Sequence, residues 1–378
     1  MSQSGAIYVH VPFCGQKCRY CDFASFGGIS EGLQERYASA LCQEIALVSG
    51  RLDWRPKTIF IGGGTPTVLA PAQLERILAA LAQHFVTEDL VEYTVEANPG
   101  TLTAEKLALL RQYGVNRLSM GVQSARQAEL ELLGRTHTFR QAQEGVELAR
   151  AAGFANISVD LIYGLPGQTV RDWRETLEAV LALGTEHLSL YQLKIEEGTV
   201  FGQWLETGRI AEFDDEIALE MYELGHRLLE AQGYQQYEIS NYAQPGKASL
   251  HNQAYWLTED YYGLGLAAHS FLRPSRFFNP TVLKDYLTPL EAGRPPRKEQ
   301  ETLTKREAME ETIFMGLRMN AGVDLQAFQA RYDEDARQIF AEAIAKCQQN
   351  GWLEIADDHL RLTDQGRVLG NLVFVEFV

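Results

Sequence analysis

The sequence predicts an α/β fold, namely a partial (β/α)6 barrel followed by a small, mainly helical C-terminal domain of winged-helix-like form. Two observations predict this arrangement. From residue 7 to about 195, short β-type runs alternate with amphipathic helical stretches, which is the pattern of a parallel sheet with crossover helices. Near the C-terminus, helical stretches lead to two short β-like runs, 351–355 and 360–362, which predict a hairpin beside helices.

Six short runs rich in apolar and β-branched residues are the predicted barrel strands. They are 7–13, 58–62, 92–96, 117–121, 156–162 and 187–193. The helices between them carry start and stop signals, with Thr103 and Thr138 as N-caps and Gly114 and Gly153 at the ends. A later helical stripe predicts core contacts; it consists of Ile217, Met221, Leu224, Leu228 and Leu229.

The domain organisation follows from these patterns. We expect the barrel to span 1–235, a barrel extension with a linker to span 236–298, and the C-terminal domain to span 299–378. The charged, Pro-rich run 290–298 has the composition of the linker itself.

Charge and hydropathy exclude several classes of partner. The 378 residues include 34 Lys plus Arg against 50 Asp plus Glu, a net charge of −16, which argues against sequence-independent nucleic-acid binding and against docking on anionic lipid by charge alone. No apolar run has the length of a membrane span, and the N-terminus lacks a basic segment followed by a hydrophobic stretch. We therefore expect a cytoplasmic protein with at most peripheral membrane contact through its partners.

Three of the five cysteines form the strongest chemical signal in the chain. Cys14, Cys18 and Cys21 are spaced C-x3-C-x2-C directly after the first predicted strand. A four-iron cluster needs four ligands, so three thiolates on one loop leave one iron open to an external ligand. A structural zinc site would need a fourth ligand nearby, for which only His10 and Asp22 are available. His10 alternates with two valines on the strand, so we expect it inside the barrel.

Polar or glycine residues follow the predicted strands, and the carboxyl ends of parallel strands meet at one edge of a sheet. After the second strand comes the glycine triplet 62–64 with Thr65, and further strands supply Gln123 and, just beyond, Arg135. Glu96 and Asp160 lie within otherwise apolar strands, where a carboxylate is costly to bury without a partner. We expect Glu96, Arg135 and Asp160 to neutralise one another; a purely structural ion-pair network is the alternative.

The C-x3-C-x2-C loop, with Tyr20 before its last cysteine, resembles the radical S-adenosylmethionine (SAM) superfamily. The resemblance implies a [4Fe–4S] cluster on the three cysteines, with SAM chelating the open iron. The later segments resemble, in order and over nearly the whole chain, the anaerobic coproporphyrinogen oxidase branch. That resemblance implies that Tyr20 packs near the adenine and that SAM is contacted by Tyr8, Gly63, Gly64, Thr65, Glu96, Gln123, Arg135 and Asp160.

A region rich in aromatic residues and histidines, 234–270, is suited to a flat aromatic ligand. Its segment His251-Asn252-x-x-Tyr255-Trp256 resembles the H-N-x-x-Y-W motif of haem chaperones in the same branch. The resemblance implies haem as cargo, haem-accepting proteins such as respiratory enzymes as partners, and a homodimer. A neutral imidazole is a common axial ligand of haem iron, so His251 is the first candidate and His269 the second, with Tyr255 and Trp256 stacking on the macrocycle. A packed histidine satisfied by its surroundings is the alternative for either one.

The other function implied by this branch is oxygen-independent coproporphyrinogen III oxidation, a radical decarboxylation. The true oxidase pattern has a fourth cysteine, C-x3-C-x2-C-x-C, where this chain has Phe23, and a long extension before the cluster loop, whereas here Cys14 is almost at the start. These departures favour the haem chaperone and leave open whether the chain is an enzyme.

Overall fold

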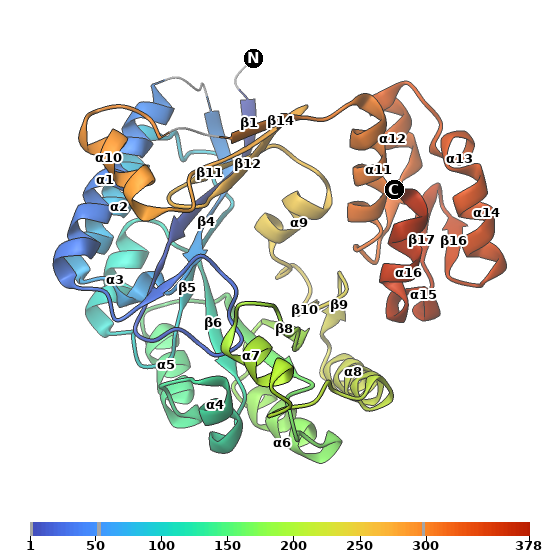
Figure 1. The fold of residues 1–378 in the computed structure, drawn as a ribbon, viewed down its shortest axis with the longest axis horizontal. Coiled ribbons are helices and arrows are strands. Elements are labelled where there is room, and N and C mark those ends of the chain that lie inside the picture. Colours follow the sequence, from blue (N-terminus) through green and yellow to red (C-terminus); the bar gives the residue numbers. More distant parts are fainter. Residues whose placement is uncertain (1–2, 51–53, 297–298) are drawn as a thin grey trace.

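The computed structural model describes residues 3–50, 54–296 and 299–378, and its centre is a curved 12-stranded sheet (Figure 1). All six predicted barrel strands are present, and they lie side by side and parallel in chain order. They are β1 (Gln3–Val11), β4 (Trp54–Gly63), β5 (Glu92–Ala97), β6 (Arg117–Gln123), β7 (Ile157–Tyr163) and β8 (His187–Gln192). The prediction of a partial (β/α)6 barrel is confirmed, and the carboxyl ends of these strands meet at one edge.

The sheet extends beyond the barrel strands at both edges. Next to β8 lie two antiparallel strands, β10 (Asn241–Ala243) and β9 (Gln235–Gln236). Next to β1 lies β11 (Tyr261–Leu264), which is parallel to it. Antiparallel strands then follow in the order β12 (His269–Leu272), β13 (Ser275–Phe278) and β14 (Glu299–Thr302). The segment from 235 to 302 therefore continues the barrel sheet, past the position where we expected the C-terminal domain to begin.

Helices cover the outer face of the curved sheet (Figure 1). They are α1 (Glu31–Ser49), α2 (Pro71–His84), α3 (Ala104–Gln112), α4 (Gln127–Leu133), α5 (Phe139–Ala151), α6 (Val170–Leu181), α8 (Asp215–Ala231) and α10 (Leu283–Glu291). Helix α7 (Val200–Glu206) lies instead beside the cysteine loop. Thr103 and Thr138 accept the predicted N-cap hydrogen bonds, from the amides of Lys106 and Gln141. Two details differ from expectation: Ile217 is 40% exposed, and Leu290 is a buried residue of α10 rather than part of a linker. The linker positions 297–298 lie outside the described residues.

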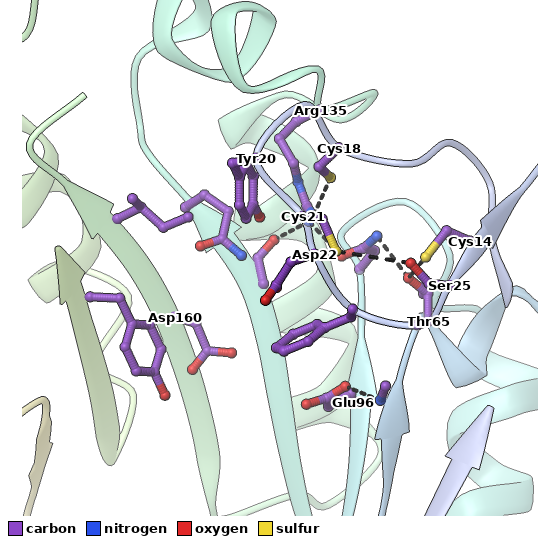
Figure 2. Close-up of a pocket in the computed structure, with 18 of the residues that line it drawn as sticks. Cys14, Cys18, Tyr20, Cys21, Asp22, Ser25, Thr65, Glu96, Arg135 and Asp160 are labelled. Carbon is purple, nitrogen blue, oxygen red and sulfur yellow. Dashed lines mark hydrogen bonds between the residues drawn. The ribbon is translucent and has the colours of Figure 1, made fainter. Parts of the chain in front are cut away.

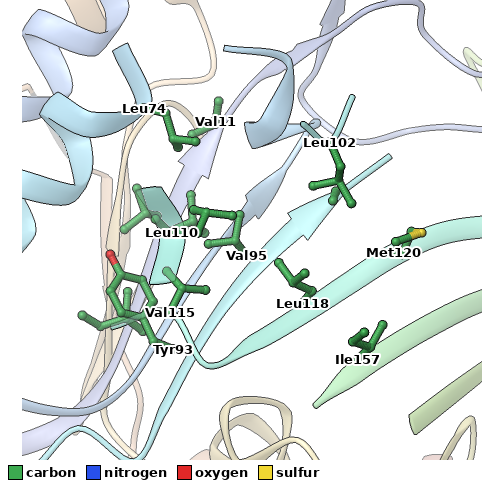
Figure 3. Packing of buried hydrophobic residues seen from close by; sticks show 14 of the residues in the cluster. Val11, Leu74, Tyr93, Val95, Leu102, Leu110, Val115, Leu118, Met120 and Ile157 are labelled. Carbon is green, nitrogen blue, oxygen red and sulfur yellow. The ribbon is translucent and has the colours of Figure 1, made fainter. Parts of the chain in front are cut away.

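The apolar core lies between the outer face of the sheet and these helices (Figure 3). Val95, Leu118, Met120 and Ile157 point outward from three neighbouring strands, where helix residues such as Leu110 cover them. Fully burying one such side chain contributes about 1.5–3 kcal/mol. Since side chains alternate along a strand, the residues between them face the barrel interior. These interior residues are polar, and they include Glu96, Ser119 and Asp160.

Helix α9 (Leu250–Trp256) lies on the concave side of the sheet, between β1 and β4 on one side and the C-terminal domain on the other (Figure 1). Ser249 caps it by accepting from the amide of Asn252, and Glu92 of β5 accepts from the amides of Leu250 and His251. The H-N-x-x-Y-W motif is therefore a short helix anchored inside the opening of the partial barrel.

The C-terminal domain has its own core and the predicted hairpin. Its strands are β15 (Val323–Asp324), β16 (Leu353–Ala356) and β17 (His359–Leu362), in the order β15-β17-β16. Its helices are α11 (Lys305–Gly316), α12 (Leu325–Tyr332), α13 (Ala336–Ile339), α14 (Ala341–Gln349), α15 (Asp364–Val368) and α16 (Gly370–Phe374), with a final 3-10 turn at Val375–Phe377. In the described part of the chain, none of the helices has the length and apolar character needed to cross a membrane.

Candidate functional site

A cavity of about 380 Å³ opens at the carboxyl ends of the barrel strands (Figure 2). Residues from the cysteine loop form one side, and the ends of the parallel strands form the floor and the other side. The cavity collects eleven of the predicted site residues: Cys14, Cys18, Tyr20, Cys21, Gly63, Gly64, Thr65, Glu96, Gln123, Arg135 and Asp160. The strand-end argument therefore located one continuous site.

Hydrogen bonds to the neighbouring elements hold the cysteine loop over this cavity. Cys14 ends the two-residue strand β2 (Phe13–Cys14), which pairs with β3 (Phe26–Gly27). At the other end of the loop, the Arg19 amide donates to Leu133 O and its guanidinium donates to Glu131 O at 2.7 Å, both at the end of α4. The amide of Phe201 at the start of α7 in turn donates to Arg19 O. The loop is thus tied to two helices between its second and third cysteines.

The three cysteines are free thiols at the rim of the cavity. Thr65 Oγ1 lies 3.8 Å from Cys14 Sγ, Ser25 Oγ lies 3.9 Å from Cys21 Sγ, and Arg135 donates to Cys18 Sγ at 3.4 Å. Burial raises the pKa of the Cys14 and Cys21 thiols.

The donor set fits an iron–sulfur cluster, because such clusters are held by Cys thiolates. Among the described residues, no three His, Cys, Asp or Glu side chains are grouped closely enough to hold one metal ion. A four-iron cluster makes a different demand, because each of three thiolates binds a different iron and the sulfurs stay apart. Two buried polar atoms of the cavity, Gln123 Oε1 and Arg135 Nε, also have no hydrogen-bond partner in the described structure. Such atoms are expected where a polar ligand completes a site.

The glycine triplet has a packing reason at each position. A Cβ atom on Gly62 would lie 2.7 Å from the Glu96 carboxyl group, and one on Gly64 would lie 2.6 Å from Phe13 O. At Gly63 the φ angle is +99°, and a Cβ would run into the His10 ring. The triplet thus allows β4 to approach β1 and Glu96 closely, while Gly63 and Gly64 still line the cavity.

Two buried carboxyl groups lie at the cavity floor. Asp160 accepts from Ser189 Oγ at 2.7 Å and from Ser119 Oγ at 3.2 Å, and Glu96 accepts from the amide of Gly63 at 2.9 Å. Burial, followed by the negative charge of Asp160, raises the pKa of Glu96 to about 8. Burial also raises the pKa of Asp160, against the opposing effect of the serine hydroxyls. The site therefore holds carboxyl groups whose ionisation a cationic ligand would favour.

The expected neutralisation by Arg135 is wrong. Its guanidinium donates to Cys18 Sγ, to Gly121 O and to Asn98 Oδ1, and it makes no ion pair with Glu96 or Asp160 in the described structure. Arg135 instead fixes the cysteine loop to β6, because it bonds both at once.

Three other predicted residues lie beneath the cavity rather than on its wall. Tyr8 bonds His10 Nδ1 through its hydroxyl at 2.9 Å, inside the barrel as expected for His10. His251 is only 1% exposed; its Nδ1 is hydrogen-bonded to Thr58 Oγ1 at 2.8 Å and its Nε2 to Tyr255 OH at 2.9 Å. Burial lowers the pKa of His251 to about 3, so the ring is neutral. In this conformation both ring nitrogens of His251 are used internally.

The remaining two predicted haem contacts lie elsewhere. Trp256 is the last residue of α9 and lies on the side of the C-terminal domain, where the Arg318 guanidinium is 4.4 Å from its ring centroid. His269 is an exposed residue of β12, and its ring stacks on Phe278 at 4.9 Å. The structure therefore separates the four haem candidates into an interior pair, an interdomain residue and a surface residue.

Sequence reasoning missed several polar residues of the barrel interior. Asn98, which joins Arg135 to Thr65, and the two serines that bind Asp160 are cavity or near-cavity groups. A signal for them existed, because polar residues occupy alternate positions in the buried strands. Arg117 and Ser119 in β6, and His187 and Ser189 in β8, follow this alternation.

Comparison with known proteins agrees with this geometry. The family model "Radical SAM superfamily" matches residues 8–180, and the model "HemN C-terminal domain" matches residues 303–369. The chain is 39% identical to heme chaperone HemW of Bacillus subtilis over 98% of both chains, and 38% identical to heme chaperone HemW of Lactococcus lactis over all of this chain and 98% of that one. The structure of coproporphyrinogen III oxidase HemN from Escherichia coli, a radical SAM enzyme, superposes with a TM-score of 0.87 at 25% identity, over 100% of this chain and 90% of that one. With such identity along its full length, the chain belongs to the HemW family of radical SAM proteins.

Proposed function

We propose that this protein is a cytoplasmic haem chaperone. It binds haem and passes it to acceptor proteins, among which respiratory enzymes are the expected class, and it acts as a homodimer. It carries a [4Fe–4S] cluster on Cys14, Cys18 and Cys21, with SAM at the open iron. The observation that carries this proposal is the 39% identity along nearly the whole chain with a protein named as a heme chaperone.

The cavity supports the SAM part of the proposal. Gly63 and Gly64 present backbone to the cavity, Gln123 and Arg135 present unpaired polar atoms, and Tyr20 presents a ring beside them. Bound SAM would supply its amino and carboxylate groups as ligands to the open iron and place a sulfonium charge in the cavity. Glu96 and Asp160 are the groups in the cavity floor that would receive this positive charge.

The second residue after the third cysteine supports a carrier rather than the oxidase. Phe23 occupies the position of the fourth cysteine of the oxidase pattern, lines the cavity mouth and is 64% exposed. Phenylalanine has no group that can ligate iron, so this position lacks the thiol that the oxidase pattern carries there.

The hydrogen bonds of the barrel interior bear on which histidine ligates haem. His251 remains the first candidate from the motif, but ligation would require the bond of one ring nitrogen, to Thr58 or to Tyr255, to break. His269 offers an exposed ring without rearrangement. Haem titration of the protein with His251→Ala and with His269→Ala, read in the Soret band, distinguishes them, because only loss of the true axial ligand changes the band position.

One assay separates the chaperone from the oxidase, which the TM-score of 0.87 to HemN keeps as the second candidate. The reconstituted, reduced protein is incubated anaerobically with SAM and coproporphyrinogen III, and a parallel sample is titrated with haem and then mixed with an apo-acceptor. We expect stoichiometric haem binding and transfer without porphyrin product. Several turnovers of coproporphyrinogen would establish the oxidase instead.

A further inference from the structure

Arg117 is a buried arginine inside the partial barrel that the site described above does not use. It is the first residue of β6 and lies opposite Thr94 of β5. The side chain is 1% exposed, and its Nε and Nη1 atoms have no hydrogen-bond partner in the described structure. Among the described residues, Arg117 therefore makes no ion pair through these two nitrogens. An isolated buried charge is costly, so its retention calls for a compensating charge nearby.

The position of Arg117 places that charge beneath the cavity floor. Residues at every second position of a strand share one face, so Arg117, Ser119 and Gly121 point to the same side of β6. Ser119 and Gly121 line the cavity, and Ser119 donates to Asp160. Arg117 is thus one step further along the strand toward its amino end. Glu96 lies opposite Ser119 in the register of β5 and β6, and Ser119 donates to Asp160, so Arg117 lies two residues below both carboxyl groups, where its charge acts to lower their pKa values.

We propose that Arg117 is the counter-charge of the SAM cavity: held below the floor, it governs the ionisation of Glu96 and Asp160 while leaving their oxygens free for a cationic ligand. The inference rests on the SAM site proposed above. A direct ion pair would occupy those oxygens, whereas among the described residues they accept hydrogen bonds from serine hydroxyls and one backbone amide. Arg117 therefore acts on the ligand through the two carboxyl groups, as a positioning residue, and does not contact the ligand itself.

The arrangement links SAM binding to a proton. Without ligand, Glu96, whose pKa is about 8, is mostly protonated at pH 7. A sulfonium charge in the cavity favours the ionised form of Glu96, so binding releases a proton from it. Affinity for SAM should accordingly rise with pH up to about 8. S-adenosylhomocysteine lacks the sulfonium charge but must lose the same amino proton to bind iron, so the Glu96 contribution is the difference between the pH profiles of the two ligands.

The buried tyrosines and histidines around the two carboxyl groups do not titrate in this pH range. Burial raises the pKa of the surrounding tyrosine hydroxyls and lowers the pKa of His187 and His251, which are further lowered by Arg117. The charged or titratable side chains that face the pair or line the cavity are Tyr8, Cys14, Cys18, Tyr20, Cys21, Asp22, Arg135, His187, Tyr191, Lys194, Glu196, Tyr237, His251 and Tyr255.

The test measures affinity rather than turnover. Wild type, Arg117→Gln and Arg117→Lys are reconstituted anaerobically, and their dissociation constants for SAM and S-adenosylhomocysteine are measured by equilibrium dialysis from pH 6.5 to 9.5. We expect wild type and Arg117→Lys to reach half-maximal SAM affinity near pH 8. Arg117→Gln should reach it about one pH unit higher, bind SAM about tenfold more weakly at pH 7, and match or exceed wild type above pH 9. Cluster absorbance and thermal unfolding confirm that each variant is folded and loaded.

Three results would overturn the proposal. The first is an Arg117→Gln profile with the wild-type midpoint. The second is an equal loss of affinity for both ligands at every pH, which indicates a packing role. The third is a Glu96→Gln variant that keeps the wild-type pH profile, because this variant has no carboxyl group to titrate at that position. This variant also keeps the proposal testable if Arg117→Gln does not fold. If wild type binds no SAM at any pH, the proposed SAM site itself fails, which is a distinct outcome.

Discussion

Replacing His251 by Ala should destabilise the protein by an amount that depends on pH. The imidazole satisfies Thr58 Oγ1 at 2.8 Å and Tyr255 OH at 2.9 Å, and it stacks on Phe60 with a 5.1 Å centroid distance. Each buried hydroxyl left without a partner costs about 1–3 kcal/mol, and the ring contact adds about 0.5–1.5 kcal/mol. We therefore expect the free energy of unfolding to fall by about 2.5–7.5 kcal/mol at pH 7.5.

Acidification should reduce the difference in unfolding free energy between wild type and His251→Ala. The pKa of His251 is about 3 in the folded protein and about 6.5 when unfolded, so between these values the unfolded chain binds a proton that the folded chain does not. Stability contributed by the neutral ring is therefore complete above pH 6.5 and declines as pH falls. At pH 5 the wild type has lost roughly 1.4 × 1.5, or about 2 kcal/mol, from this group, whereas the Ala variant has no such group to titrate.

Urea unfolding at pH 7.5 and pH 5, followed by circular dichroism, measures both quantities. Thr58→Val is the matched control, because it removes one hydrogen bond of His251 and keeps the ring, and we expect it to cost about 1–3 kcal/mol. The reasoning is refuted if His251→Ala costs under about 1 kcal/mol at pH 7.5, or if its cost is the same at both pH values. The measurement also shows how much of any haem-binding defect in this variant comes from the fold.

Three further outcomes are expected. Cys18→Ala should abolish the visible absorbance of the reconstituted cluster. Cys42→Ala, which changes a cysteine outside the cavity, should retain this absorbance. If Cys18→Ala also retains it, the assignment of Cys18 as a cluster ligand is wrong. Arg19→Ala should increase the rate at which a chelator removes the cluster several-fold, because the loop loses its hydrogen bond to the Glu131 carbonyl. The rate for Arg19→Lys should lie between those of wild type and Arg19→Ala. Equal rates in all three proteins would mean that this hydrogen bond does not hold the loop. Ser189→Ala removes the 2.7 Å hydrogen bond to Asp160 and so should raise the pKa of that carboxyl and weaken SAM binding more at pH 6.5 than at pH 8.5; binding independent of this change would count against Asp160 as a SAM contact.

The barrel strands and the cavity were predictable because both depend on local pattern and simple topology. Alternating β-type and helical stretches gave the six strands, and the common edge of parallel strands gathered the cysteine loop, Glu96 and Asp160. The outer strands β12 to β14 were not predicted, because they are four-residue segments with polar positions and depend on pairing with the rest of the sheet.

The residues beneath the cavity were harder to predict for a different reason. A histidine that ligates iron and one that packs inside a barrel look alike in sequence, and the bond that decides for His251 joins residues 193 positions apart. Arg117 was not predicted as a site residue because it begins its strand, whereas the argument from parallel strands points to residues at their carboxyl ends. Its role depends on distance from two carboxyl groups, which only the folded arrangement supplies.

The division of the strands into an apolar outer face and a polar inner face also fixes how they can pair during folding. A slip of one residue in β5 or β7 would place Glu96 or Asp160 under the outer helices and turn Val95 or Val159 into the cavity. Such a slip would bury an unpaired carboxyl in an apolar layer and simultaneously expose valine to a polar space. The groups that shape the ligand cavity therefore also disfavour misregistered sheets, and removing their charge should make alternative pairings less costly.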